Sequence, residues 1–239
     1  MDTGSAIDLA VSTVIFALRS NDPLQPRGEP TVWIPLVRRL RAPYDNHWAL
    51  PGGPLAADEG PTGAARRALH STTGLQPKYL EQLYTFGDPE RSPGATRVVS
   101  IVYWALVGID EVTHAPARQN VRWLPADDLP TLAFDHNLIV DYALWRLRTK
   151  VSHSRIAHAF LGETFTLAEL REVHEVVLGK RLDPANFRRQ VLTSGHVVAT
   201  DEMRTGGRHR PARLYRYDES MSMTDHGPLG PVLLSERTS

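Results

Sequence analysis

The chain of 239 residues contains no cysteine. That absence excludes disulfide frameworks, cysteine-based zinc sites and thiolate catalysis. Long hydrophobic runs are also missing, because the longest uncharged apolar stretch is residues 98–109 and a membrane-spanning helix needs about 20 apolar residues. No basic region precedes the first apolar stretch, whereas a secretory signal would carry one. We therefore expect a cytoplasmic protein with no membrane partner.

Net charge is absent as well, since 27 basic side chains balance 27 acidic ones. Over the whole chain, this balance argues against a nucleic-acid partner. The charges are unevenly distributed, however: residues 180–217 hold nine basic and three acidic side chains, a local charge of +6. A basic block of this kind is a candidate contact surface for a phosphate backbone, with a solvated arginine-rich surface as the alternative.

The first 150 residues alternate strand-like and helix-like patterns. Apolar runs rich in β-branched residues predict strands at 10–18, 31–40 and 98–107, with Pro35 placing part of the second at an edge or bulge. Helices are expected over residues 60–73 and after Asp135, which can cap the second of them. This mixture predicts an α/β or α+β domain that spans residues 1–150, and we assign the chain to the α+β fold class.

The second half of the chain has the pattern of a small DNA-binding domain. Thr166-Leu-Ala-Glu169 is a capping box, and Asp183-Pro184 can open a second helix. Two short strands at 196–200 and 213–217 flank a polar, basic hairpin. Helices followed by such a hairpin predict a winged helix-turn-helix, whose second helix enters the major groove.

We assign this winged helix-turn-helix domain to residues 151–225 and a flexible tail to residues 226–239. The alternative for the small domain is a helical subdomain used for dimerisation.

A glycine-rich box precedes the helix predicted at residues 60–73. Its lead-in is Trp48-Ala-Leu-Pro-Gly-Gly53, and its spacing resembles the Nudix box at Gly53, Glu59, Arg67, Leu69, Gly74 and Leu75. The three later glutamates of that box are replaced by Ala68, Ser71 and Thr72, which share one helix face. Since Mg²⁺ prefers anionic oxygen ligands, a single remaining glutamate is a poor metal site. We expect little or no hydrolase activity, no cofactor and at most weak Mg²⁺ binding.

The surviving box residues also have structural alternatives. Gly52 and Gly53 can serve tight backbone geometry, and Trp48 can belong to the core. Pairing between Arg67 and Glu59 is as plausible as ligand contact.

A degenerate Nudix domain followed by a winged helix resembles the Nudix-related transcriptional regulators of NAD metabolism, the NrtR family. Further segments that resemble the family lie at residues 86–91, 97–100, 132–136, 165–170, 186–189 and 210–215. The resemblance implies an N-terminal Nudix-like α/β/α sandwich with a mixed sheet, followed by the C-terminal winged helix-turn-helix domain. It implies a homodimeric repressor that binds palindromic double-stranded DNA near genes of NAD synthesis or salvage. ADP-ribose or a related NAD-derived nucleotide would release it from this operator.

Carried over by position, the resemblance gives two sets of site residues. Candidate effector contacts are Trp48, Gly52, Gly53, Glu59, Arg67, Phe86, Arg91, Arg97 and His136, with a structural role at a helix start as the alternative for His136. Candidate DNA contacts are Thr166, Asn186, Arg188, Arg189, Arg204, Arg208 and Arg210. Ser92 and Gly94 depart from the family pattern.

Two other functions compete with a repressor. One is an ADP-ribose pyrophosphatase with a divergent metal site, which the missing glutamates argue against. The other is a nucleotide-sensing adaptor whose C-terminal domain binds protein instead of DNA.

Overall fold

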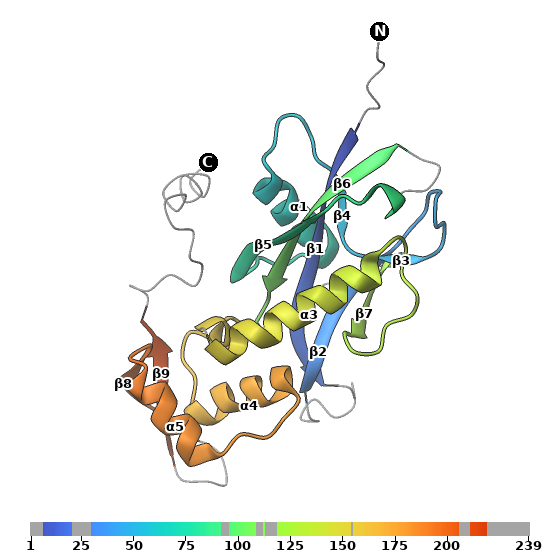
Figure 1. Cartoon of the computed structure of the whole chain (residues 1–239). Helices are drawn as coiled ribbons and strands as arrows, with labels where there is room; N and C mark the ends of the chain where they lie inside the picture. The colour runs from blue at the N-terminus through green and yellow to red at the C-terminus, as the bar shows by residue number, and fades with distance from the viewer. Residues whose placement is uncertain are drawn as a thin grey trace.

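A computed structural model describes residues 7–20, 30–91, 96–108, 112, 119–153, 155–205 and 211–218. Within these residues, seven strands form one mixed sheet with the central order β3-β2-β1-β6-β5, while β4 pairs with β1 and β7 pairs with β2 (Figure 1). The pairing of β1 with β6 is parallel, and the other pairings are antiparallel. The strands are β1 (Ile7–Ser20), β2 (Pro30–Arg38), β3 (Trp48–Ala49), β4 (Gly52–Pro54), β5 (Tyr79–Phe86), β6 (Arg97–Leu106) and β7 (Val121–Pro125).

Two helices cover opposite faces of this sheet because β1 alternates its apolar side chains between them. Val14, Phe16 and Leu18 lie in the same buried cluster as α3 (His136–His153). Ile15 and Ala17 face the other way, in a cluster with Leu69 of α1 (Pro61–Thr73). The predicted α/β/α sandwich with a mixed sheet is therefore confirmed. A short 3₁₀ turn, η1 (Pro89–Arg91), follows β5.

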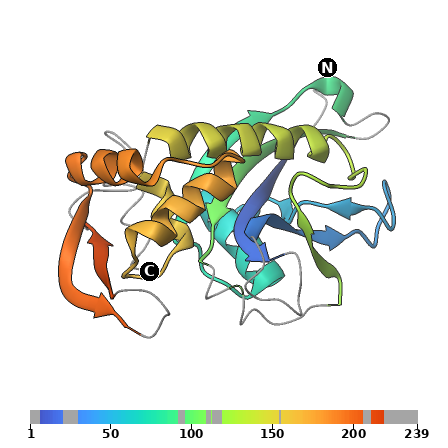
Figure 2. The ribbon, with the colours of Figure 1, turned by 90° about the horizontal axis from the view of Figure 1, so that it is seen from below.

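The C-terminal part contains the predicted winged helix. The 3₁₀ helix η2 (Arg155–Phe160) leads to α4 (Leu167–Leu178), α5 (Pro184–Thr193) and the hairpin of β8 (Val197–Arg204) and β9 (Ala212–Tyr217). Figure 2 shows α5 and the hairpin at the end of the molecule away from the large sheet. Both arms of the capping box are present, and Gly179 ends α4 in the left-handed conformation.

The two halves of the chain share one core. Helix α3 runs without a break through residue 150, where the sequence predicts a domain end, and α4 packs against α3 and β2. Leu170, Val173 and Val177 of α4 belong to the same buried cluster as Leu144 and Leu147 of α3. This continuity physically links the first domain to the helices of the winged helix.

Local details of the fold differ in part from the expectations. In the hairpin, β9 covers the strand predicted at residues 213–217. The first strand, β8, is longer than predicted, because it extends to Arg204 instead of ending at residue 200. Helix α3 continues to His153, and the 3₁₀ helix η2 follows it. The edge position predicted for Pro35 is confirmed, because Pro35 lies beyond the stretch of β2 that pairs with β1 and is paired with β7 alone. The tail at 226–239 lies outside the described residues.

No helix among the described residues is both long and apolar enough to cross a membrane.

Candidate functional site

Helix α5 presents a basic, polar surface. Asp183 caps it by accepting a hydrogen bond from Asn186 N at 2.7 Å, and Pro184 occupies its first turn. Phe187 is buried against the ring of His174 in α4, with ring centroids 5.0 Å apart. Arg188 and Arg189 are therefore turned outward and are exposed. Arg189 Nη2 donates to Asn186 Oδ1 at 2.7 Å, which joins these two side chains into one polar group.

The hairpin is fixed to α4 by an ion pair. Arg204 at the end of β8 binds Glu169, the glutamate of the capping box. Sequence reasoning placed Arg204 on the wing, and the structure places it there. The arginines predicted at the tip, Arg208 and Arg210, lie outside the described residues. Arg213 and Arg216 of β9 are exposed, and sequence reasoning counted their charge without assigning them to the interface.

Thr166 does not lie on this exposed surface. Its side chain is buried, and its hydroxyl accepts from Glu169 N at 3.2 Å. These contacts give Thr166 a structural role in the cap, and its assignment as a DNA contact stays a prediction. Phe165 next to it pairs with Tyr215 of the wing, so the same segment anchors the hairpin.

The glycine-rich box has mainly structural contacts. A Cβ at Gly52 would lie 2.3 Å from Val11 O, so only glycine fits against β1 there. A Cβ added at Gly53 would meet no atom within 4 Å, so packing does not require glycine there. Arg67 binds Glu59 in an exposed ion pair, which lowers the pKa of Glu59 through the hydrogen bond from the guanidinium. Of the two roles left open for Arg67, this geometry favours the pairing.

A cleft of about 460 Å³ opens beside α1, the helix that follows the glycine-rich box. We call it the box cleft, and its lining residues are Val37, Arg39, Leu40, Arg41, Ala49, Leu50, Gly52, Ser71, Thr72, Asn120 and Val121. Two of the three positions that replace the Nudix glutamates therefore face this cleft. Arg39 and Arg41 are lining residues that the sequence did not identify as site residues. Their only sequence signal was a basic stretch, residues 38–41, that follows a strand.

Arg91 is committed to the protein itself. Its side chain is 7% exposed and forms a two-pronged ion pair with Asp135, at 2.8 Å from Nε and 2.7 Å from Nη2. Nη1 donates to Val98 O and Ser100 Oγ. These contacts favour a structural role for Arg91, and its predicted ligand contact stays a prediction. Asp135 stands directly before α3, and its backbone oxygen accepts from Ile139 N at 3.1 Å.

The remaining predicted effector residues lie apart from the box cleft. Arg97 is exposed and donates to Gly87 O at 2.9 Å. Phe86 belongs to an aromatic group with Tyr84 and Tyr142, at centroid distances of 5.5 and 6.3 Å. Trp48 packs on the core, and its carbonyl accepts from Ala133 N at 2.8 Å. The structure does not bring these three together with Ser71 and Thr72.

His136 holds the box loop onto α3. Its Nδ1 accepts a hydrogen bond from Leu50 N at 3.0 Å, so the ring is neutral with its proton on Nε2. Burial lowers the pKa of His136 to about 4. The structural alternative for this residue is the one that the geometry supports.

This buried histidine predicts a pH dependence of stability. The unfolded ring, with a pKa of about 6.5, binds a proton more readily than the folded one, so the contribution of His136 is complete above pH 6.5 and is lost as pH falls toward 4. Going from pH 7 to pH 5 should cost about 2 kcal/mol of unfolding free energy. His136→Asn keeps an acceptor for Leu50 N and cannot titrate.

Urea unfolding of both proteins at pH 7 and pH 5 checks this expectation. The wild type should lose more stability than H136N. His174 is also buried with a lowered pKa, but it is common to both proteins and cancels in the difference. Equal losses in the two proteins would contradict the assignment.

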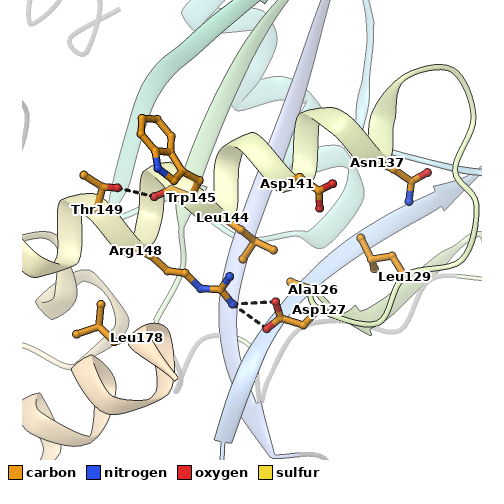
Figure 3. A pocket seen from close by; sticks show the side chains of 10 residues that line it. All are labelled: Ala126, Asp127, Leu129, Asn137, Asp141, Leu144, Trp145, Arg148, Thr149 and Leu178. Carbon is orange, nitrogen blue, oxygen red and sulfur yellow. Dashed lines mark hydrogen bonds and ion pairs between the residues drawn. The ribbon is translucent and has the colours of Figure 1, made fainter. Parts of the chain in front are cut away.

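A second groove, of about 710 Å³, lies between α3, the loop after β7 and the end of α4 (Figure 3). Arg148 of α3 crosses it, with Nη2 at 2.8 Å and 3.0 Å from the Asp127 carboxylate oxygens. Its Nε donates to Val177 O in the last turn of α4 at 3.3 Å. One side chain therefore joins the loop of the first domain to a helix of the second.

Both parts of the chain match models of known protein families. Residues 14–142 match the NUDIX domain model, and residues 157–217 match the model of the NrtR DNA-binding winged helix domain. The ADPR responsive transcriptional repressor NtrR of Acinetobacter baylyi is 34% identical over 188 residues, which cover 76% of this chain and 74% of the relative. An ADP-ribose pyrophosphatase of Methanocaldococcus jannaschii is 33% identical over 112 residues, covering 46% of this chain and 66% of the relative.

The structure also resembles that of Shewanella oneidensis NrtR complexed with a 27mer DNA. The TM-score is 0.74 at 32% sequence identity, and the match covers 88% of this chain and 93% of the other. A Nudix fold with a winged helix attached, matched along most of the chain by a repressor and by a DNA-bound structure, shows that this chain belongs to the NrtR family.

Proposed function

We propose that the protein is a transcriptional repressor of genes of NAD synthesis or salvage, and that ADP-ribose or a related NAD-derived nucleotide releases it from its operator. The observation that carries this proposal is the joining of two parts in one chain. One is an NrtR-type winged helix with exposed arginines on α5, and the other is a Nudix domain without its catalytic glutamates. The similarity to the Acinetobacter baylyi repressor supports it.

The protein acts in this proposal as a regulator and not as an enzyme. The similarity to an ADP-ribose pyrophosphatase concerns the Nudix half of the chain and supports the ligand class. Hydrolysis would need anionic groups to hold Mg²⁺ and activate water, and the box helix offers Ala68, Ser71 and Thr72 instead. Detection of AMP and ribose 5-phosphate from ADP-ribose at ordinary enzymatic turnover would favour the pyrophosphatase alternative.

A mobility-shift experiment tests the repressor directly. The full-length protein is mixed with DNA from upstream of its own gene and of NAD-related genes. We expect a shifted band that persists when competitor DNA of unrelated sequence is added. Adding ADP-ribose should remove this band. Absence of a sequence-specific shift on all of these fragments would contradict the proposal.

We further propose that the protein works as a homodimer, because one α5 helix reads one half of a palindromic site and two-fold symmetry matches the other half. Light scattering of the free protein and of its operator complex gives the stoichiometry. Two chains per operator are expected, and one chain per operator would contradict it.

Release of DNA requires that the Nudix domain influence α4 and α5, and Arg148 is the contact that we assign to this coupling. Its pair with Asp127 is largely solvent-exposed and so adds little to stability. Arg148→Leu keeps the apolar stem and removes both contacts. We expect little change in folding or in operator affinity without effector, while the effect of ADP-ribose on operator affinity falls roughly threefold or more.

Arg146→Leu is the matched control for this coupling. Arg146 lies on the same helix but faces Glu81 of β5, at 3.9 Å, within the first domain. Fluorescence anisotropy of labelled operator, with and without ADP-ribose, measures the ratio of affinities for each variant. Equal ratios for R148L and the wild type would remove Arg148 from the coupling.

A further inference from the structure

The box cleft is lined by basic side chains, whereas the Nudix box would place acidic, metal-binding side chains at the same position. Two arginines, Arg39 and Arg41, line it together with the amide of Asn120 and the hydroxyls of Ser71 and Thr72. Among the described residues that line the cleft, none is acidic. In the Nudix pattern the same helix face gathers carboxylates, so the sign of the local field is reversed.

Mg²⁺ does not fit this cleft. The ion takes hard oxygen ligands, usually with carboxylates among them, and Ser71 supplies only a hydroxyl that already donates to Ala68 O at 3.0 Å. Glu59, the one glutamate left in the box, is bound by Arg67. Across the described part of the chain, no group of three or more His, Asp or Glu side chains is placed to hold a metal ion.

An anion fits the cleft well. Arg39 uses its guanidinium within the protein: Nε donates to Pro43 O at 3.0 Å, Nη2 donates to Arg41 O at 3.4 Å, and the group lies 4.6 Å from the ring centroid of Phe134. These contacts shape the loop that carries Arg41 to the mouth of the cleft. Arg41 is the exposed arginine of the cleft lining. Guanidinium groups pair with phosphate oxygens through two parallel hydrogen bonds and need no metal to neutralise the charge.

We propose that the box cleft binds a phosphate or diphosphate group directly through Arg41, on the loop that Arg39 holds, without a divalent metal ion. The identity of the complete ligand, a nucleotide such as ADP-ribose, rests on the proposed function. The cleft volume of about 460 Å³ lies within the range of small-molecule sites. In this proposal an arginine binds the diphosphate directly, where the Nudix glutamates would bind it through a metal ion.

Calorimetric titration of the full-length protein in EDTA tests the cleft, with inorganic pyrophosphate as one ligand and ADP-ribose as the other. We expect ADP-ribose affinity in EDTA to lie within twofold of that in Mg²⁺. Arg41→Ala should weaken both ligands about tenfold or more. Arg122→Ala, which removes an exposed arginine of β7 outside the cleft lining, should have no effect.

A pair of variants at Ser71 isolates the charge. Ser71→Glu restores a carboxylate at a box position, and Ser71→Gln has nearly the same size without the charge. In EDTA, S71E should bind pyrophosphate at least tenfold more weakly than S71Q. Equal binding of the two variants, or a loss of ADP-ribose binding by tenfold or more on removal of Mg²⁺ from the wild type, would overturn the proposal.

The two ligands separate this inference from the proposed function. If pyrophosphate binds in an Arg41-dependent manner and ADP-ribose does not bind, the anion site stands and the proposed effector is wrong. If ADP-ribose releases the operator but neither ligand depends on Arg41, the proposed function stands and the metal-free cleft is wrong.

Discussion

Replacing both Arg188 and Arg189 with alanine should lower operator affinity by about 100-fold or more. Both side chains are exposed on α5, and Arg189 is hydrogen-bonded to Asn186, a residue type that can read adenine. A bidentate arginine–base pair contributes about 1–3 kcal/mol, and a phosphate contact is also lost when the charge is removed. The double variant therefore loses one or two specific contacts and part of the salt dependence.

Anisotropy titrations at several salt concentrations measure both losses. The fold should survive, because Phe187 and Val191 supply the packing of α5 and the two arginines do not. Circular dichroism and light scattering confirm that point. Wild-type affinity and salt slope in the double variant would show that α5 is not the recognition helix.

Arg91→Ala should destabilise the Nudix domain by about 3–5 kcal/mol, because it leaves Asp135 with no partner for its partly buried charge. Ser100 Oγ and Val98 O would also lose their donor. In a chain of this length that change corresponds to a fall in Tm of roughly 10 °C. Arg97→Ala is the matched control, since Arg97 is exposed and its hydrogen bond goes to the backbone of Gly87.

Thermal unfolding of the two variants distinguishes a structural Arg91 from a ligand contact. If R91A keeps the wild-type Tm and loses only effector affinity, the ion-pair interpretation is wrong. Burial by itself would raise the pKa of Asp135, but the hydrogen bonds and charge of Arg91 outweigh it and lower that pKa. The pair should therefore stabilise the protein above about pH 4 and lose its effect in stronger acid.

Local chemistry made much of the fold predictable. The capping box at Thr166, the Asp183-Pro184 helix start and the glycine at 179 are short-range signals, and the structure has all three. The continuous apolar run in β1 likewise predicts a strand that is buried on both faces. The continuity of α3 through residue 150 was not predictable in this way, because it depends on packing against α4.

The site was harder to predict because its contacts join distant segments. Arg91 and Asp135 are 44 residues apart, and Leu50 and His136 are 86 apart. A motif identifies such residues but does not say whether they bind each other or a ligand. Arg39 and Arg41 belong to no motif, and only the folded loop brings them beside Ser71 and Thr72.

We propose that nucleotide binding and operator binding oppose each other in this protein. The most direct measurement is a two-way titration of the full-length protein: operator affinity at saturating ADP-ribose, and ADP-ribose affinity on saturating operator. Linkage requires both affinities to fall by the same factor, which we expect to be at least fivefold. Operator affinity that does not change when ADP-ribose is bound would contradict the account.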